Sequence, residues 1–144
     1  MSGETTGRVR VILRLEGLCV FVAALLVYSN SGFSWGMFAL FFLTPDISFL
    51  GYLAGPRVGA ATYNTAHSYI GAIACVVAGH FLPAPAFSCA GIIWCVHIGF
   101  DRALGYGLKY STGFGFTHLG IIGRFVKSAP NIPVTKAASQ TAQP

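Results

Sequence analysis

Residues 11–29 read VILRLEGLCVFVAALLVYS, and this stretch decides the class of fold. Its only charged residues are Arg14 and Glu16, both near its beginning. An α-helix rises about 1.5 Å per residue, so about 20 apolar residues cross the roughly 30 Å hydrocarbon layer of a bilayer. The stretch therefore predicts a membrane-spanning helix.

Three more apolar blocks follow, at 33–55, 58–82 and 86–107, separated by short polar or Pro/Gly-rich joints. The whole chain of 144 residues is 54% hydrophobic and 9% charged, with a mean hydropathy of +0.66. A soluble domain carries about 25% charged residues. Because an open sheet would leave backbone groups unpaired in lipid, the spans are expected to be helices. We therefore predict an all-α membrane bundle of about four transmembrane helices.

The same pattern divides the chain into three parts. We expect a cytoplasmic N-terminal segment at 1–10 and a four-helix transmembrane domain at 11–128. Residues 129–144 are polar, contain proline and lack aromatic residues, so a disordered cytoplasmic tail is expected there. Thr117 is a candidate cap for a short interfacial helix that would run to about Phe125 on the cytoplasmic surface.

The basic residues predict the orientation. With four spans, all nine Lys and Arg fall on one side of the membrane, and the two opposite loops contain none. The positive-inside rule then places both termini in the cytoplasm. The formal net charge of +5 is explained by this topology and by anionic lipid headgroups, so no nucleic-acid partner is implied. The nine basic residues are Arg8, Arg10, Arg14, Arg57, Arg102, Lys109, Arg124, Lys127 and Lys136.

Two features predict how the spans depart from simple helices. The triplet Thr44-Pro45-Asp46 falls in the middle of the second span, where proline removes a backbone donor. It predicts either an ordinary kink or a broken span that opens onto a cavity. Glycines spaced by four residues let helix backbones approach closely in lipid, within one chain or in a homo-oligomer. Gly51, Gly55 and Gly59 have this spacing, and we call them the glycine seam.

Ionisable residues inside spans are costly and indicate function. Asp46, His67, His97 and Asp101 all fall in the cytoplasmic half of their spans, so they are expected at similar depth. His97 and Asp101 are four residues apart and therefore share a helix face. We predict that these four residues meet in the bundle interior, and that His118 could close the cluster from the cytoplasmic side.

Several chemistries fit such a cluster. The residues could bind a divalent metal, with ligands drawn from Asp46, His67, His97, Asp101 and His118. They could instead act by metal-free acid–base catalysis, with Asn64 as a further site residue, or relay protons or ions. In the simplest alternative, Asp101 pairs with Arg102 and the histidines only bridge helices.

Several longer strings resemble one known family. They include Arg14-Leu15-Glu16-Gly17, the segment 51–59 (GYLAGPRVG), Tyr63-Asn64-x-x-His67, the segment 97–102 (HIGFDR) and Thr117-His118-Leu119-Gly120. Over residues 14–123 the chain resembles the bacterial membrane family catalogued as domain of unknown function 4260. The resemblance implies a small multi-span protein of a bacterial inner membrane and supplies no activity.

The leading functional expectation is a membrane-embedded enzyme. It would act on a lipid-like or hydrophobic substrate from the cytoplasmic leaflet, with His97 oriented by Asp101 as base and with Asp46 and His67 supplying an acid or sharing a metal. One alternative is a small transporter or proton-coupled carrier. The other is a non-catalytic helper subunit that binds a membrane partner through its glycine seams.

Overall fold

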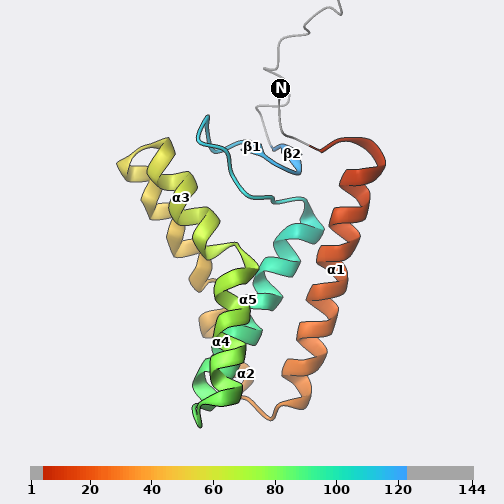
Figure 1. Cartoon of the computed structure of the whole chain (residues 1–144), viewed down its shortest axis with the longest axis vertical. Coiled ribbons are helices and arrows are strands. Elements are labelled where there is room, and N and C mark those ends of the chain that lie inside the picture. Colours follow the sequence, from red (N-terminus) through yellow and green to blue (C-terminus); the bar gives the residue numbers. More distant parts are fainter. Residues whose placement is uncertain (1–4, 123–144) are drawn as a thin grey trace, which may run out of the picture.

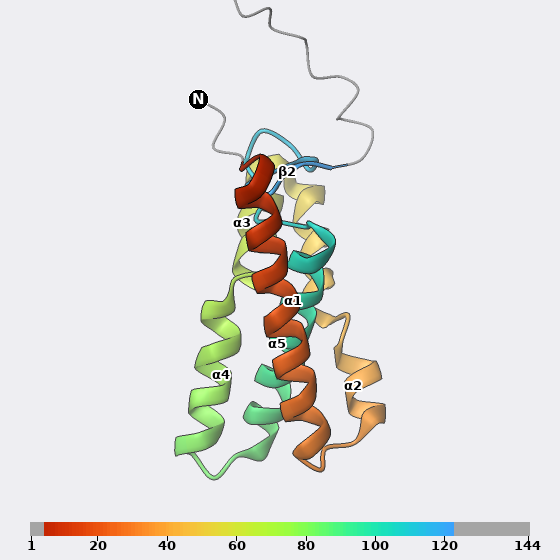
Figure 2. The same cartoon turned by 90° about the vertical axis from the view of Figure 1, so that its right-hand side faces the viewer.

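Helix α5 (Pro85–Leu104) lies at the centre of the computed structural model, which describes residues 5–122 (Figure 1). The helices α1 (Gly7–Asn30), α2 (Trp35–Phe41) and α4 (Tyr69–Phe81) all contact α5. Figure 2 shows α2 and α4 on opposite sides of it. The predicted all-α bundle is therefore confirmed, and α1 begins four residues before the expected start of the first span.

The second predicted span is interrupted near its middle. Helix α2 ends at Phe41, and the chain continues as a 3-10 helix, η1 (Thr44–Ala54), with Pro45 in its first turn. Proline suits a first turn because the amide donor it lacks would be unpaired there anyway. The predicted interruption at this triplet is confirmed. Since 3-10 helices longer than one turn are uncommon, η1 depends on neighbours, and Thr62 Oγ1 donates to Ser48 O at 3.0 Å.

The third predicted span is not one helix, contrary to expectation. It consists of α3 (Pro56–Ala66) and α4, placed end to end with a bend between them (Figure 1). His67 ends α3, and the Ser68 side chain accepts a hydrogen bond from Ile70 N, which caps the start of α4. A serine at this position competes with continuation of a helix.

The chain after α5 folds back over one end of the bundle. Gly105 adopts a left-handed conformation (φ 97°), which ends α5 as glycine commonly does. The expected interfacial helix from Thr117 is wrong for the described residues, because β1 (Phe116–Thr117) and β2 (Gly120–Ile121) form an antiparallel pair instead. Gly120 has φ 115°, a conformation that a helix would not allow. The expected tail at 129–144 lies outside the described residues.

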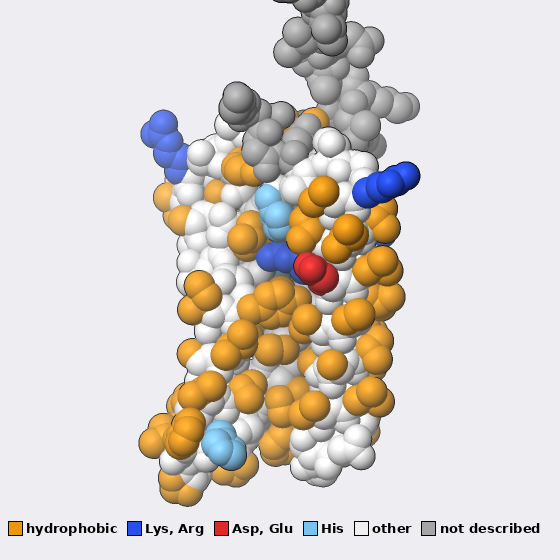
Figure 3. Space-filling model, turned by 45° about the vertical axis from the view of Figure 1, so that its right-hand side comes forward, with side chains coloured by type: hydrophobic (Ala, Val, Ile, Leu, Met, Phe, Trp, Pro, Cys, Tyr) orange, Lys and Arg blue, Asp and Glu red, His pale blue; other side chains and the backbone are white. Residues whose placement is uncertain are grey.

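The outer surface is apolar along most of the bundle. Figure 3 shows hydrophobic side chains over much of one face, while the charged side chains visible there lie in its upper half. Large apolar side chains are exposed, including Leu53 (87%), Ile70 (80%) and Phe81 (78%). Three helical segments are long and apolar enough to cross a membrane: Gly7–Asn30, Trp35–Ala54 and Pro85–Leu104. Lipid is the solvent that makes such a surface stable.

Glycines allow the helices to pack closely. A Cβ atom on Gly99 would lie 2.6 Å from Phe21 N of α1, and one on Gly91 would lie 2.7 Å from Ala72 O of α4. The predicted seam in η1 and α3 works in the same way, because a Cβ on Gly51 would meet Thr62 and one on Gly59 would meet the Tyr52 ring. Two of the three seam glycines therefore pack within the chain.

The two ends of the bundle differ in composition. An apolar cluster of Tyr28, Cys89, Ile92 and Ile93 fills the end where α1 finishes and α5 begins. The start of α1, the start of α3 and the end of α5 all lie at the other end (Figure 1). The polar residues predicted to meet are carried by the elements that converge toward this second end.

Candidate metal centre

Asp46 comes from the first turn of η1. The backbone N–H of Asp46 donates to Leu43 O at 3.1 Å, and its neighbour Pro45 is buried. A carboxylate in the first turn of a helix is favoured by the helix dipole. The side chain is 33% exposed, so of the four predicted residues it is the one most open to the surroundings.

His67 lies at the break between α3 and α4 and is fully buried. Its Nδ1 lies 3.0 Å from Tyr63 O. A carbonyl oxygen only accepts, so Nδ1 carries the proton and Nε2 of the neutral ring presents a lone pair. This is how histidine ligands of metals are usually oriented. The Tyr63 ring also stacks on the imidazole, with centroids 3.7 Å apart, which holds the ring in place.

Side chains of α5 stabilise the break itself. Ending α3 frees backbone carbonyls, which lipid cannot hydrogen-bond. The indole N–H of Trp94 donates to Ala66 O, and Arg102 Nη2 donates to His67 O at 2.9 Å. Arg102 Nη1 donates to Tyr106 O at 2.8 Å. Hydrogen bonds from these α5 side chains to the backbone of Ala66 and His67 therefore fix the position of His67.

His97 and Asp101 lie one turn apart on α5. His97 is 2% exposed, and the Phe42 ring packs edge-on against it with centroids 5.3 Å apart. Its Nδ1 has no hydrogen-bond partner among residues 5–122. Asp101 Oδ2 accepts a hydrogen bond from the Tyr63 hydroxyl at 3.3 Å. Both side chains point toward η1 and the break in the third span.

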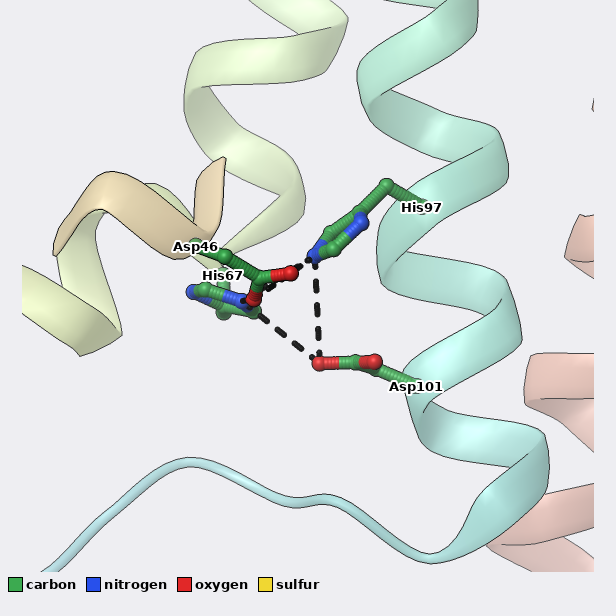
Figure 4. A group of neighbouring side chains, drawn as sticks. All are labelled: Asp46, His67, His97 and Asp101. Atoms are coloured by element: carbon green, nitrogen blue, oxygen red, sulfur yellow. Dashed lines mark hydrogen bonds and ion pairs between the residues drawn. The ribbon is translucent and has the colours of Figure 1, made fainter. Parts of the chain in front are cut away.

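One ligand atom from each of the four residues converges on a common point (Figure 4). His67 Nε2 lies 3.2 Å from His97 Nε2, 3.4 Å from Asp46 Oδ1 and 3.5 Å from Asp101 Oδ2. His97 Nε2 lies 3.5 Å from Asp46 Oδ1 and 3.9 Å from Asp101 Oδ2. All four atoms lie within 4.8 Å of one another. The predicted meeting of these residues is confirmed.

Four of the five separations, at 3.2–3.5 Å, are close to the edges of a coordination tetrahedron, while the His97–Asp101 separation of 3.9 Å is longer. Bonds of about 2.0–2.2 Å to N and O ligands place two ligands roughly 3.3–3.6 Å apart. A direct N–H···O hydrogen bond would instead be about 2.7–3.2 Å long. With both carboxylates ionised and both imidazoles neutral, the cluster also carries two negative charges, which one divalent cation would neutralise. We call Asp46, His67, His97 and Asp101 the polar cage.

The segment after α5, residues 105–122, covers one end of the polar cage, and we call it the covering segment. Asn64 Nδ2 donates to Lys109 O at 2.9 Å, and Lys109 N donates to Asn64 Oδ1 at 2.6 Å. At its far side the segment is attached to the N-terminus, because Thr5 N donates to His118 O at 2.8 Å. The segment is thus held by both α3 and the residues before α1.

Two residues predicted for the site have other partners. The Asn64 amide uses both its oxygen and its nitrogen to hold the Lys109 backbone. His118 Nδ1 accepts a hydrogen bond from Leu108 N at 2.8 Å, and His118 is outside the group of four ligand atoms. Burial lowers the pKa of the His118 imidazole, with a smaller contribution from Arg102. These two side chains hold the covering segment.

Sequence reasoning missed the residues that support the cage. Tyr63 contacts both His67 and Asp101, but a tyrosine in an apolar span gives no signal of its own. In the simplest alternative Arg102 would pair with Asp101, whereas its guanidinium donates to two backbone carbonyls. Those hydrogen bonds are needed only because the helix breaks at His67. In the sequence, Ser68 was the residue that could have indicated this break.

Comparison with known proteins identifies the family of the chain but assigns no activity to it. The model of a family described as domain of unknown function (DUF4260) matches residues 10–122. No match was found among curated proteins or among solved structures. The match covers η1, the helix break and the covering segment, and includes all four residues of the polar cage. The chain therefore belongs to the DUF4260 family.

Proposed function

We propose that the polar cage binds one divalent metal ion and that the protein is a membrane-embedded hydrolase acting on a lipid-like substrate. The observation that carries the proposal is the geometry of four ligand atoms from three separate elements, all within 4.8 Å of one another. Two imidazoles and two carboxylates are ligand types that suit zinc and related divalent ions. Such an ion would supply Lewis acidity and lower the pKa of a bound water.

Metal-free acid–base chemistry fits the distances less well. A general base needs an oriented imidazole, but the His97 and Asp101 ligand atoms are 3.9 Å apart, which is beyond hydrogen-bond length. The hydrogen-bond partner of His97 Nε2 is Nε2 of His67 at 3.2 Å, so no carboxylate in the described part of the chain orients this imidazole as a base. Ligands of one metal need no hydrogen bond to each other, so the 3.9 Å separation favours the metal.

The surroundings of Asp46 support a lipid-like substrate. Leu43, Ile47 and Leu50 flank it on the same segment, and each is more than 60% exposed on the apolar surface. The most exposed member of the cage therefore lies next to the surface that lipid would cover. The basic residues near this end of the bundle favour the cytoplasmic leaflet as the side of entry.

A carrier is supported less well than an enzyme. Broken helices in transporters use freed backbone carbonyls to coordinate ions. Here the carbonyls of Ala66 and His67 are occupied by Trp94 and Arg102. A helper that binds through its glycine seam is also less supported, because Gly51 and Gly59 pack within the chain. Assembly of a homo-oligomer through Gly55 remains a separate proposal.

Metal analysis of the full chain tests the function. Purified protein in detergent, loaded with Zn²⁺ or Co²⁺ and desalted, is expected to retain about one equivalent of metal. His67→Ala and His97→Ala should each reduce affinity roughly tenfold or more, because each removes a ligand. His80→Ala is the matched control, since His80 lies at the opposite end of the bundle. A wild-type protein that binds neither ion would overturn the proposal.

A further inference from the structure

Lys109 is a buried cation beside the polar cage. The residue is 4% exposed, and its ammonium nitrogen lies 3.9 Å from the ring centroid of Phe114 and 4.9 Å from that of Tyr63. Within residues 5–122 no carboxylate lies within ion-pair distance of it. The faces of aromatic rings attract an ammonium group, but they do not satisfy its three N–H donors. The ammonium therefore has donors left for a ligand.

Tyr63 connects this ammonium to the polar cage. The Tyr63 ring contacts Lys109 and also stacks on His67, and its hydroxyl donates to Asp101. Arg102 is the other buried Lys or Arg of the described chain, and it is already bound to two backbone carbonyls. Of these two buried cations, Lys109 is thus the one with its charge available at the site.

The backbone of Lys109 is held independently of its side chain. Both hydrogen bonds to Asn64 use the N–H and C=O of Lys109, so the covering segment keeps its position whatever the side chain is. A buried lysine that held only the fold would be expected to donate to a carbonyl or a carboxylate. The Lys109 ammonium lies on ring faces instead, which leaves it ready for an anionic group.

We infer that the substrate carries a phosphoryl ester, and that the Lys109 ammonium binds its non-bridging oxygens while the metal held by the polar cage binds the same group. This inference rests on the proposed metal centre and names the substrate class. A carboxylic ester is neutral in its ground state, whereas a phosphoryl ester carries negative charge on oxygens that two cations can share.

The reaction balances as a simple hydrolysis. The oxygen of one water molecule bonds to phosphorus and the bond from phosphorus to the ester oxygen breaks. One water proton ends on the departing alcohol oxygen, and the other is released or stays on the phosphate. Lys109 keeps its proton throughout and stabilises the charge on the phosphoryl oxygens, so its role is binding.

Phosphate binding to the Co²⁺-loaded protein tests the inference without any turnover. The visible spectrum of the bound Co²⁺ is followed while inorganic phosphate is added, and then dioctanoyl phosphatidic acid with dioctanoylglycerol as the uncharged comparison. Both phosphate probes should perturb the spectrum of the wild type. Lys109→Met should weaken their binding by about tenfold or more, whereas Lys109→Arg should restore most of it.

Arg57→Met is the matched control, because Arg57 is an exposed cation at the start of α3, and it should leave binding within about twofold. Tighter binding of the lipid than of inorganic phosphate would identify a lipid headgroup as the source.

A wild type without a Co²⁺ spectrum would refute the metal centre. Normal Co²⁺ binding with no phosphate effect, or equal phosphate binding by Lys109→Met, would overturn this inference alone. If Lys109→Met does not load Co²⁺, Lys109→Gln takes its place under the same criterion.

Discussion

The two ends of the bundle are stabilised in different ways. At the end where α1 finishes, regular helices pack Tyr28, Ile92 and Ile93 into an apolar cluster, and their backbone groups are paired inside the helices. At the end that holds the polar cage, one span becomes a 3-10 helix and another breaks at His67. There the freed backbone groups are bound by side chains such as Arg102. The comparison shows how a membrane bundle can hold irregular backbone where it binds polar groups.

The largest expected effect comes from removing Arg102. Arg102→Met leaves the carbonyls of His67 and Tyr106 without their donor, and neither lipid nor another described residue replaces it. The His67 carbonyl is fully buried, and an unsatisfied buried group costs about 1–3 kcal/mol, so the loss of stability should be about 2 kcal/mol or more. Thermal unfolding in detergent measures the loss. Arg57→Met should change stability by less than about 0.5 kcal/mol. Similar values for the two variants would mean that the break does not need the guanidinium.

A smaller effect is expected at the apolar end. Ile93→Val removes one buried methylene from a side chain that is 1% exposed, which should cost about 1 kcal/mol. The variant should still bind one metal ion with wild-type affinity, because Ile93 lies in the apolar cluster and contributes no ligand to the cage. Unfolding and Co²⁺ titration of the same sample check both statements. Loss of metal affinity would show that the two ends are coupled through α5.

The smallest expected effect is the change in stability between about pH 7 and pH 8. Burial lowers the pKa of the Lys109 ammonium to about 8, against the opposing attraction of Asp101. The unfolded chain keeps this proton until about pH 10.4, so above pH 8 the unfolded state binds more protons and wild-type stability rises with pH. Relative to Lys109→Met, the wild type should gain a few tenths of a kcal/mol between about pH 7 and pH 8.

Comparison with Lys109→Met isolates this effect, because the variant retains every other titrating group, including His118, Tyr63 and Asp101. The difference in free energy of unfolding between the two proteins is measured at each pH in detergent. A difference that stays constant from pH 7 to above pH 9 would show that Lys109 keeps its ordinary pKa. That result would also mean that the ammonium is better solvated than its burial indicates.

Part of the site followed from the sequence because depth along a span can be counted. His97 and Asp101 are four residues apart in an uninterrupted helix, so their shared face was predictable. Asp46 and His67 fall at the same depth in spans that run in opposite directions, which made their meeting predictable too. Asn64 lies close to that depth and His118 was expected beneath the cluster, but counting residues cannot say whether a polar side chain faces a ligand or a backbone group.

The sequence by itself predicted a membrane environment and determined the helical class of this protein, because lipid accepts only long apolar segments whose backbone bonds are internal. It also determined which polar residues share a depth. Only the tertiary structure decided that the third span breaks at His67, since Trp94 and Arg102 come from a helix 27 or more residues later in the chain. The same is true of Lys109, whose contact with Tyr63 arises because Asn64 holds the covering segment. Long-range hydrogen bonds fix these positions, and their partners cannot be identified from local sequence.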